Sequence, residues 1–150
     1  MFDRRQILSA TLAAGASPFA AQAAWAQAAM SRITAYGFSF EGLNGDRIRV
    51  ADYAGKPLMV VNTASQCGYT PQFTGLQDLW SQFHDRGFAV IGVPSNDFGG
   101  QEPGGAAEIT KTASDTYHVT FPIATKTVVK GPDAHPFYKW AALERPAELP

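Results

Sequence analysis

The fold of this chain is decided by residues 58–73, LMVVNTASQCGYTPQF, in which an unbroken apolar run leads through a cysteine toward a helix. The apolar run at 58–61 shows no polar alternation, so it predicts a strand covered on both faces, as in the centre of an α/β sheet. Thr70 suits the N-cap of a helix and Pro71 its first position, and Gly87 suits its C-terminal end. Between Pro71 and Gly87, apolar residues recur at helical spacing, at Phe73, Leu76, Trp80 and Phe83.

The flanking segments extend this strand-loop-helix unit into a larger α/β domain. Residues 34–54 alternate between apolar and polar side chains around Leu43-Asn44-Gly45-Asp46, which predicts a β-hairpin. Tyr36, Phe38 and Phe40 are expected on one apolar face of it. Residues 88–93 predict a second buried strand, and a glycine-rich loop follows from Pro94 to Gly105. Three further elements are expected: a weaker helix at 106–117, a short strand beginning at 121–123 and a last helix at 136–144. This order predicts an α/β fold with helices packed on a central sheet.

Composition excludes several classes of protein. The chain has 150 residues, 45% of them hydrophobic and 17% charged, which suits one globular domain with a single apolar core. Twelve Lys and Arg against thirteen Asp and Glu give a net charge of −1 with no basic stripe, so we expect no nucleic-acid partner. The single cysteine excludes an intrachain disulfide, and the three histidines are too scattered to predict a metal site.

Residues 1–28 predict an export signal peptide, which leaves residues 29–150 as the domain. Arg4 and Arg5 supply the positive end, and no charge occurs from residue 6 to 31. Residues 26–28 form an A-x-A cleavage site, and residues 21–23 are a second candidate. The segment resembles a bacterial twin-arginine signal, although Asp3 stands where such signals usually have Ser or Thr. We therefore expect a periplasmic or otherwise exported protein without stable membrane association. A retained membrane anchor and a disordered tail are the alternatives.

Cys67 lies where a buried strand ends and a helix begins, the usual place for active sites in open α/β sheets. Free N–H groups and the helix dipole favour an anion at such a position, so we expect a reactive thiolate. Gly68 leaves room beside the sulfur for a small substrate. Position alone leaves open the alternative that this lone cysteine is a buried apolar residue.

Residues 61–77 closely resemble the active-site signature of the Cys-type glutathione peroxidase family. Three further blocks of the sequence resemble that family in the same order, at 94–104, 119–123 and 131–140. The resemblance covers about Ile33 to Trp140. It implies a thioredoxin-like fold and an enzyme that reduces hydrogen peroxide or organic hydroperoxides, with glutathione or a thioredoxin-like protein as reductant and no metal or organic cofactor.

The same resemblance implies roles for two residues. Cys67 would be the peroxidatic residue, which attacks the O–O bond and becomes a sulfenic acid. Gln101 would be its polar partner, whose amide N–H stabilises charge on the leaving oxygen. Apart from the resemblance, Gln101 is better explained as an amide that caps its own loop.

The sequence departs from the family pattern at two places. Members that use thioredoxin carry a resolving cysteine at the position of Ala113, so here we expect an external thiol to reduce the oxidised sulfur. The sequence also ends at Pro150, before the family's Trp-Asn-Phe motif, and neither Trp140 nor Asn96 aligns with that pair. We expect a C-terminally truncated member that lacks the last strand and helix. Two alternatives to a working peroxidase stay open, a peroxide sensor or redox adaptor and an inactive truncated remnant.

Overall fold

A computed structural model describes residues 34–144, so the predicted export segment and the last six residues lie outside the described part of the chain. The strands are β1 (Ser39–Glu41), β2 (Arg47–Arg49), β3 (Leu58–Thr63) and β4 (Ala89–Pro94). The helices are α2 (Gln72–Phe83), α3 (Ala106–Thr110) and α4 (Pro136–Glu144). Short 3₁₀ turns occupy η1 (Ala35–Gly37), η2 (Val50–Tyr53) and η3 (His84–Arg86), and a π-helical turn, η4 (Lys111–Thr116), extends α3. None of these helices is long and apolar enough to cross a membrane.

The predicted hairpin is confirmed. Strands β1 and β2 pair antiparallel with Phe40 opposite Ile48, and both side chains are buried. Gly45 has a φ of 83°, a conformation that glycine adopts without the cost that a Cβ would bring. The expectation that Tyr36 shares the buried face with Phe38 and Phe40 is wrong. Tyr36 belongs to the η1 turn, which rotates its side chain away from the strand alternation and leaves it 44% exposed.

Strands β3 and β4 form a parallel pair that runs in register from Leu58 opposite Ala89 to Thr63 opposite Pro94. Every residue of β4 is buried, as its sequence predicts. On the other side of β4, bridges at residues 123 and 124 connect it to the hairpin, so the short strand expected at 121–123 is reduced to these isolated bridges.

Strand β3 is more exposed to solvent than its sequence predicts. Its only strand partner within residues 34–144 is β4, so β3 is an edge strand of the described sheet. Met59 on this strand is 36% exposed, and Asn62 is exposed as well. The prediction that 58–61 is covered on both faces is therefore wrong, whereas the same prediction for β4 is confirmed.

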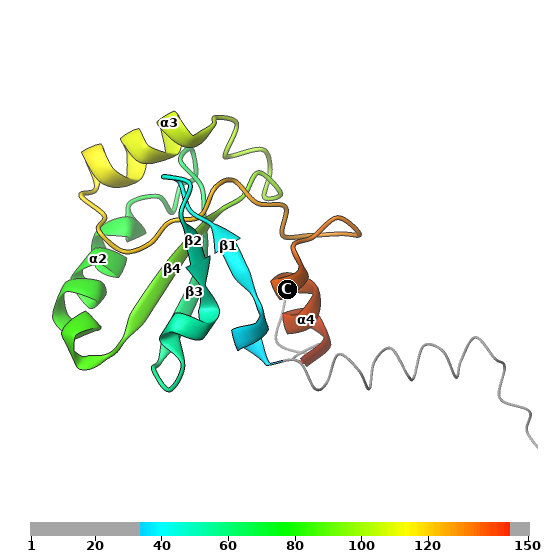
Figure 1. The fold of residues 1–150 in the computed structure, drawn as a ribbon. Coiled ribbons are helices and arrows are strands. Elements are labelled where there is room, and N and C mark those ends of the chain that lie inside the picture. The colour runs from blue at the N-terminus through cyan, green and yellow to red at the C-terminus, as the bar shows by residue number, and fades with distance from the viewer. Residues whose placement is uncertain (1–33, 145–150) are drawn as a thin grey trace, which may run out of the picture. The chain divides into compact units, whose positions relative to one another are not determined.

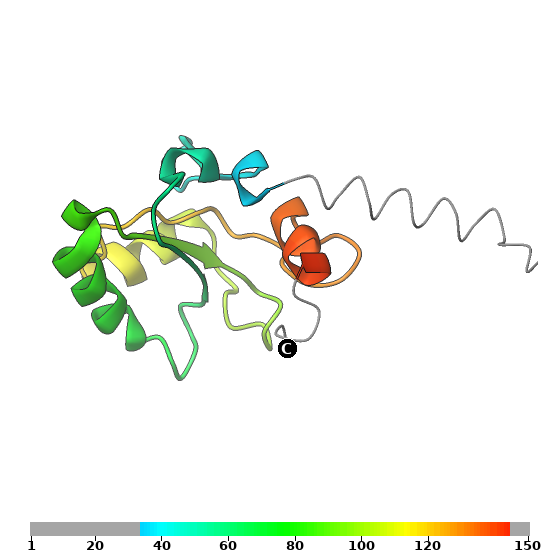
Figure 2. The ribbon, with the colours of Figure 1, turned by 90° about the horizontal axis from the view of Figure 1, so that it is seen from below.

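Two apolar clusters lie on opposite faces of β4, because successive side chains of a strand point to opposite faces. The first cluster joins the hairpin to β4 and contains Phe40, Ile48, Val50, Ile91, Val93, Ala124 and Val129. The second joins β4 to α2 and α3 and contains Phe73, Val90, Ile109, Ala113, Val119, Phe121 and Ile123. Figure 1 shows α2 and α3 on one side of β4 and the hairpin with α4 on the other, and Figure 2 shows the same arrangement from below.

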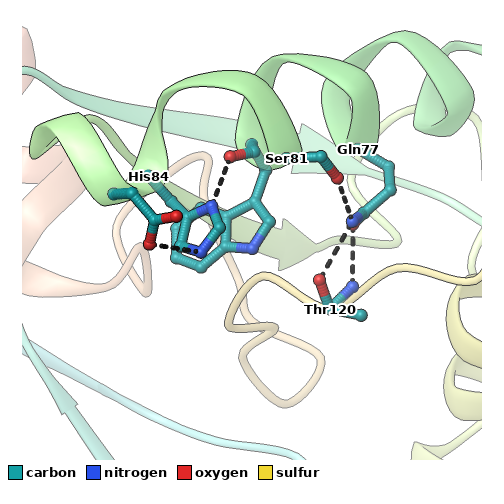
Figure 3. A network of polar contacts seen from close by, with 6 residues as sticks. Gln77, Ser81, His84 and Thr120 are labelled. Carbon is teal, nitrogen blue, oxygen red and sulfur yellow. Dashed lines mark hydrogen bonds and ion pairs between the residues drawn. The ribbon is translucent and has the colours of Figure 1, made fainter.

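Polar contacts hold α2 against the segment that follows η4 (Figure 3). Gln77 donates through Nε2 to Thr120 Oγ1 at 2.9 Å, and its Oε1 accepts the Thr120 N–H at 2.8 Å. At the end of the helix the His84 ring stacks on Trp80 with 5.1 Å between ring centroids. Gly87 then ends the turn with a φ of 94°, which confirms the predicted helix end.

Candidate active site

Cys67 lies in a turn between β3 and α2, and the helix begins only at Gln72. The expected position of Cys67 between a strand and a helix is confirmed, but the expectation that Thr70 is the N-cap and Pro71 the first helical residue is wrong, because Pro71 itself is the N-cap. Thr70 Oγ1 instead accepts the Cys67 N–H at 3.1 Å and faces the carbonyl oxygen of Ala64 at 2.8 Å. The hydroxyl that the sequence assigns to the helix is engaged in closing the cysteine loop.

The thiol of Cys67 is half-buried and free. The backbone N–H of Tyr69 points at Sγ from 3.5 Å, and the Tyr69 ring beyond it is 75% exposed. A backbone donor aimed at the sulfur favours negative charge there. The reactive atom is thus reachable from solvent while its loop is held by hydrogen bonds.

The structure brings the two predicted site residues together. Cys67 and Gln101 line one hollow of about 440 Å³, with Tyr69 and Phe98 as its aromatic walls. The remaining lining residues are Asn62, Thr63, Ala64 and Gly68. The backbones also meet, since the Gln66 N–H donates to the Gln101 carbonyl oxygen at 3.0 Å. Cys67 and Gln101 therefore border one partly apolar space.

The glycine-rich loop that carries Gln101 is fixed to the rest of the domain by Asp97. Its Oδ2 accepts the backbone N–H of Val129 at 2.6 Å and that of Lys130 at 3.0 Å. These donors, the Val129 N–H above all, lower the pKa of the Asp97 carboxyl below its ordinary value. The Lys130 ammonium in turn lies 4.0 Å from the centroid of the Phe98 ring, so one wall of the hollow is held by a cation–π contact.

Sequence reasoning missed two polar residues beside the site. Glu102 is 1% exposed, and its carboxylate accepts hydrogen bonds from Ser65 in the cysteine loop. Tyr138 of α4 donates its hydroxyl to Asn62 Oδ1, which lines the hollow, and burial raises the pKa of this phenol. Both contacts join residues far apart in the chain, and the only sequence signal for Glu102 is its position next to Gln101.

Two further expectations concern the position of the missing resolving cysteine and the histidines that predict no metal site. Ala113, at the position of the resolving cysteine in other members, is fully buried in the η4 turn. Within residues 34–144, no group of three or more His, Cys, Asp and Glu side chains is arranged to hold a metal ion.

Comparison with known proteins identifies the family. A family model described as glutathione peroxidase matches residues 35–142. The chain belongs to the glutathione peroxidase family. The hydroperoxy fatty acid reductase gpx1 of Synechocystis is 50% identical over 118 residues, which are 79% of this chain and 70% of that protein. The glutathione peroxidase-like peroxiredoxin GPX5 of Chlamydomonas reinhardtii is 46% identical over 105 residues, or 70% of this chain and 65% of that protein.

Solved structures agree with this assignment. The apo form of Trgpx is 33% identical and superposes with a TM-score of 0.60 over 79% of this chain and 69% of that one. A secreted disulfide oxidoreductase of Mycobacterium tuberculosis is 13% identical with a TM-score of 0.53 over 71% of this chain and 69% of that one, which supports the fold alone. The predicted α/β thioredoxin-like fold is confirmed.

Family membership also fixes the general chemistry. This glutathione peroxidase family member is an oxidoreductase of the thiol-dependent peroxidase type, as predicted. The chain spans 65–70% of the length of the two relatives named above.

Proposed function

We propose that this glutathione peroxidase family member reduces hydroperoxides through Cys67. The observation that carries the proposal is the shared hollow of Cys67 and Gln101. The thiolate attacks one oxygen of the peroxide, the O–O bond breaks, and the second oxygen takes up a proton and leaves as water or alcohol. Sulfur supplies the two electrons and becomes a sulfenic acid. The Gln101 amide stabilises the negative charge that develops on the leaving oxygen.

An external thiol completes the cycle. Cys67 is the only cysteine, so no sulfur of this chain can form an intramolecular disulfide with the sulfenic acid. A thiol such as glutathione attacks the sulfenic sulfur, releases water and forms a mixed disulfide, and a second thiol then frees Cys67. A thioredoxin-like protein can supply both thiols. No metal and no organic cofactor enters this sequence of steps.

The walls of the hollow favour organic hydroperoxides alongside hydrogen peroxide. Tyr69, Phe98 and Ala64 present apolar surface next to the sulfur, on which a hydrocarbon chain can pack. The name of the Synechocystis relative, hydroperoxy fatty acid reductase, supports the same substrate class.

Residues 1–28 would direct this activity out of the cytoplasm. The paired Arg4 and Arg5, the uncharged stretch behind them and the A-x-A at 26–28 support this proposal. The match to the family model begins at residue 35, downstream of the segment. Fractionation of cells that express the chain should place it in the periplasm, and replacement of both arginines by lysine should retain it in the cytoplasm if the twin-arginine route is used.

Steady-state peroxide consumption tests the proposed activity. We expect many turnovers per chain with glutathione or with thioredoxin, none without a reductant, and none in Cys67→Ser. One equivalent of peroxide should add one oxygen to Cys67 in the mass spectrum. Undiminished consumption by Cys67→Ser would overturn the peroxidatic role. A single equivalent consumed with every reductant would instead favour a peroxide sensor or redox adaptor.

Gln101→Ala tests the amide donor. The loss of one such donor typically lowers a rate by about 10²-fold or more, and we expect a fall of that order in the rate of Cys67 oxidation by peroxide. The matched control is Gln66→Ala, since Gln66 is an exposed glutamine beside Cys67 whose side chain does not line the hollow. Equal rates in the two variants would remove Gln101 from the mechanism.

A further inference from the structure

Glu102 is a buried carboxylate bound to the cysteine loop. Its Oε2 accepts the Ser65 backbone N–H at 2.8 Å and the Ser65 hydroxyl at 3.1 Å. Its Oε1 is buried and has no partner among the described residues. A charge withdrawn from water in this way is costly unless it is hydrogen-bonded, so the bonds to Ser65 are the main compensation visible here.

The backbone around Glu102 is fixed from the opposite side. The Glu102 N–H donates to Asn96 Oδ1 at 3.0 Å. The Lys126 ammonium donates to three successive carbonyl oxygens, those of Glu102, Pro103 and Gly104, at 3.3, 3.2 and 2.8 Å. The segment after Gln101 is therefore held by a side-chain amide and by an ammonium.

These contacts surround the two residues of the proposed mechanism. Ser65 lies two residues before Cys67, and Glu102 directly follows Gln101. The bond between Ser65 and Glu102 thus joins the loop of the sulfur to the loop of the amide, in parallel with the backbone bond from Gln66 to Gln101. Loss of the carboxylate would leave only backbone bonds, from Gln66 to Gln101 and from Ser95 to Thr63 at the base of the loops, to set the spacing of the two loops.

We infer that Glu102 is a positioning residue, which holds the cysteine loop through Ser65 so that Cys67 and Gln101 face the same hollow, while Lys126 fixes the backbone of Glu102. The inference rests on the proposed function. Glu102 acts on the oxidation of Cys67 by peroxide, where the sulfur and the amide must act together. Attack of the thiol on a simple alkylating agent needs no amide donor, so it serves as the comparison reaction.

The test measures two rates in the full 150-residue chain. The first is the second-order rate of Cys67 oxidation by hydrogen peroxide and by cumene hydroperoxide, and the second is the rate of alkylation by iodoacetamide at the same pH. A displacement of about 1 Å can lower a rate by ~10²-fold, so we expect Glu102→Ala to lower the peroxide rate at least about tenfold relative to the alkylation rate. Glu102→Gln keeps an oxygen that can accept the Ser65 N–H. Its ratio of peroxide rate to alkylation rate should therefore stay within about threefold of the ratio in the unmodified chain.

The control is Glu41→Ala, which removes an exposed carboxylate on β1 and should change neither rate. An unchanged ratio in a folded Glu102→Ala, or equal losses in the Ala and Gln variants, would overturn the positioning role.

If Glu102→Ala does not fold, the comparison moves to Lys126→Met with Lys111→Met as control. A ratio lowered at least about threefold in Lys126→Met alone supports the inference, and an unchanged ratio overturns it. Absence of Cys67 oxidation in the unmodified chain would instead defeat the proposed function.

Discussion

His135 shows how one ring can hold two elements together. Its Nδ1 accepts the Phe137 N–H of α4 at 3.2 Å, so the ring proton lies on Nε2, which donates to the Ser39 carbonyl oxygen of β1 at 3.1 Å. The ring also stacks on Phe40 at a centroid distance of 4.6 Å. Every one of these contacts suits the neutral imidazole. Burial lowers the pKa of His135 below its ordinary value, against a smaller opposite effect of the Ser39 carbonyl.

This pKa shift predicts a stability change on the acid side of neutrality. As the pH falls through the ordinary histidine value of about 6.5, the unfolded chain binds a proton that the folded chain does not yet bind. The contribution of His135 to the free energy of unfolding is therefore constant above that pH and decreases from there down to the folded pKa. His135→Asn, which can still accept the Phe137 N–H, should lose this part of the pH dependence in urea unfolding at pH 7.5 and 5.0.

The control for this experiment is His118→Asn, because His118 is exposed and its φ of 54° is one that asparagine tolerates. Unfolding midpoints that keep the full pH dependence in His135→Asn would contradict the role given to the ring.

The residues of the site differ in how far the sequence could reveal them. Cys67 and Gln101 stand in long motifs, and the structure places both at one hollow. Glu102 was missed because its partner, Ser65, is 37 residues away, and a glutamate in a glycine-rich loop ordinarily predicts an exposed side chain. Burial of a charge is a property of the assembled loops, and no local pattern encodes it.

At the scale of elements, the contact between α2 and Thr120 makes a predictable contribution to the free energy of unfolding. Gln77→Ala removes both hydrogen bonds to Thr120 (Figure 3). Each such bond contributes about 0.5–1.5 kcal/mol, and these are exposed, so we expect the free energy of unfolding to fall by about 1–2 kcal/mol. The rate of Cys67 oxidation should not change, because neither residue lines the hollow.

Ser81→Ala is the matched control for the helix, since it removes only the exposed bond between Ser81 and Gln77. Its effect should be below about 0.5 kcal/mol. If chemical denaturation gave equal losses of unfolding free energy for the two variants, the contact with Thr120 would contribute no more to stability than the bond between Ser81 and Gln77.

Two of the wrong predictions, the cover of β3 and the start of α2, have a common cause. Strands β3 and β4 show the same unbroken apolar pattern, yet β4 is fully buried and β3 is partly exposed, because their neighbours in the sheet differ. Thr70 has the right residue type for an N-cap, but its hydroxyl oxygen accepts the Cys67 N–H of the preceding loop instead of an N–H of the helix. Local patterns predict which elements form, and the tertiary neighbours decide how those elements end and how far they are covered.

At the scale of the described domain, β4 makes the two apolar clusters depend on each other. Ile91 and Val93 belong to the cluster beneath the hairpin, and Val90 belongs to the cluster beneath α2 and α3. Neither face can open without exposing the strand that the other face covers. We therefore expect residues 34–144 to unfold in one cooperative transition.

Two conservative core substitutions test this dependence. Ile48→Val alters the hairpin cluster and Ile109→Val alters the α3 cluster, and each should lower the free energy of unfolding by about 0.5–1.5 kcal/mol. The two residues share no cluster, so the double variant should lose the sum of the single effects within about 0.5 kcal/mol. Val128→Ala, at a 47% exposed position, should have almost no effect. Urea unfolding followed by circular dichroism and by tryptophan fluorescence should give the same midpoint for every variant. Separate midpoints, each moved by only one of the two isoleucine substitutions, would mean that the faces unfold independently and that β4 does not couple them.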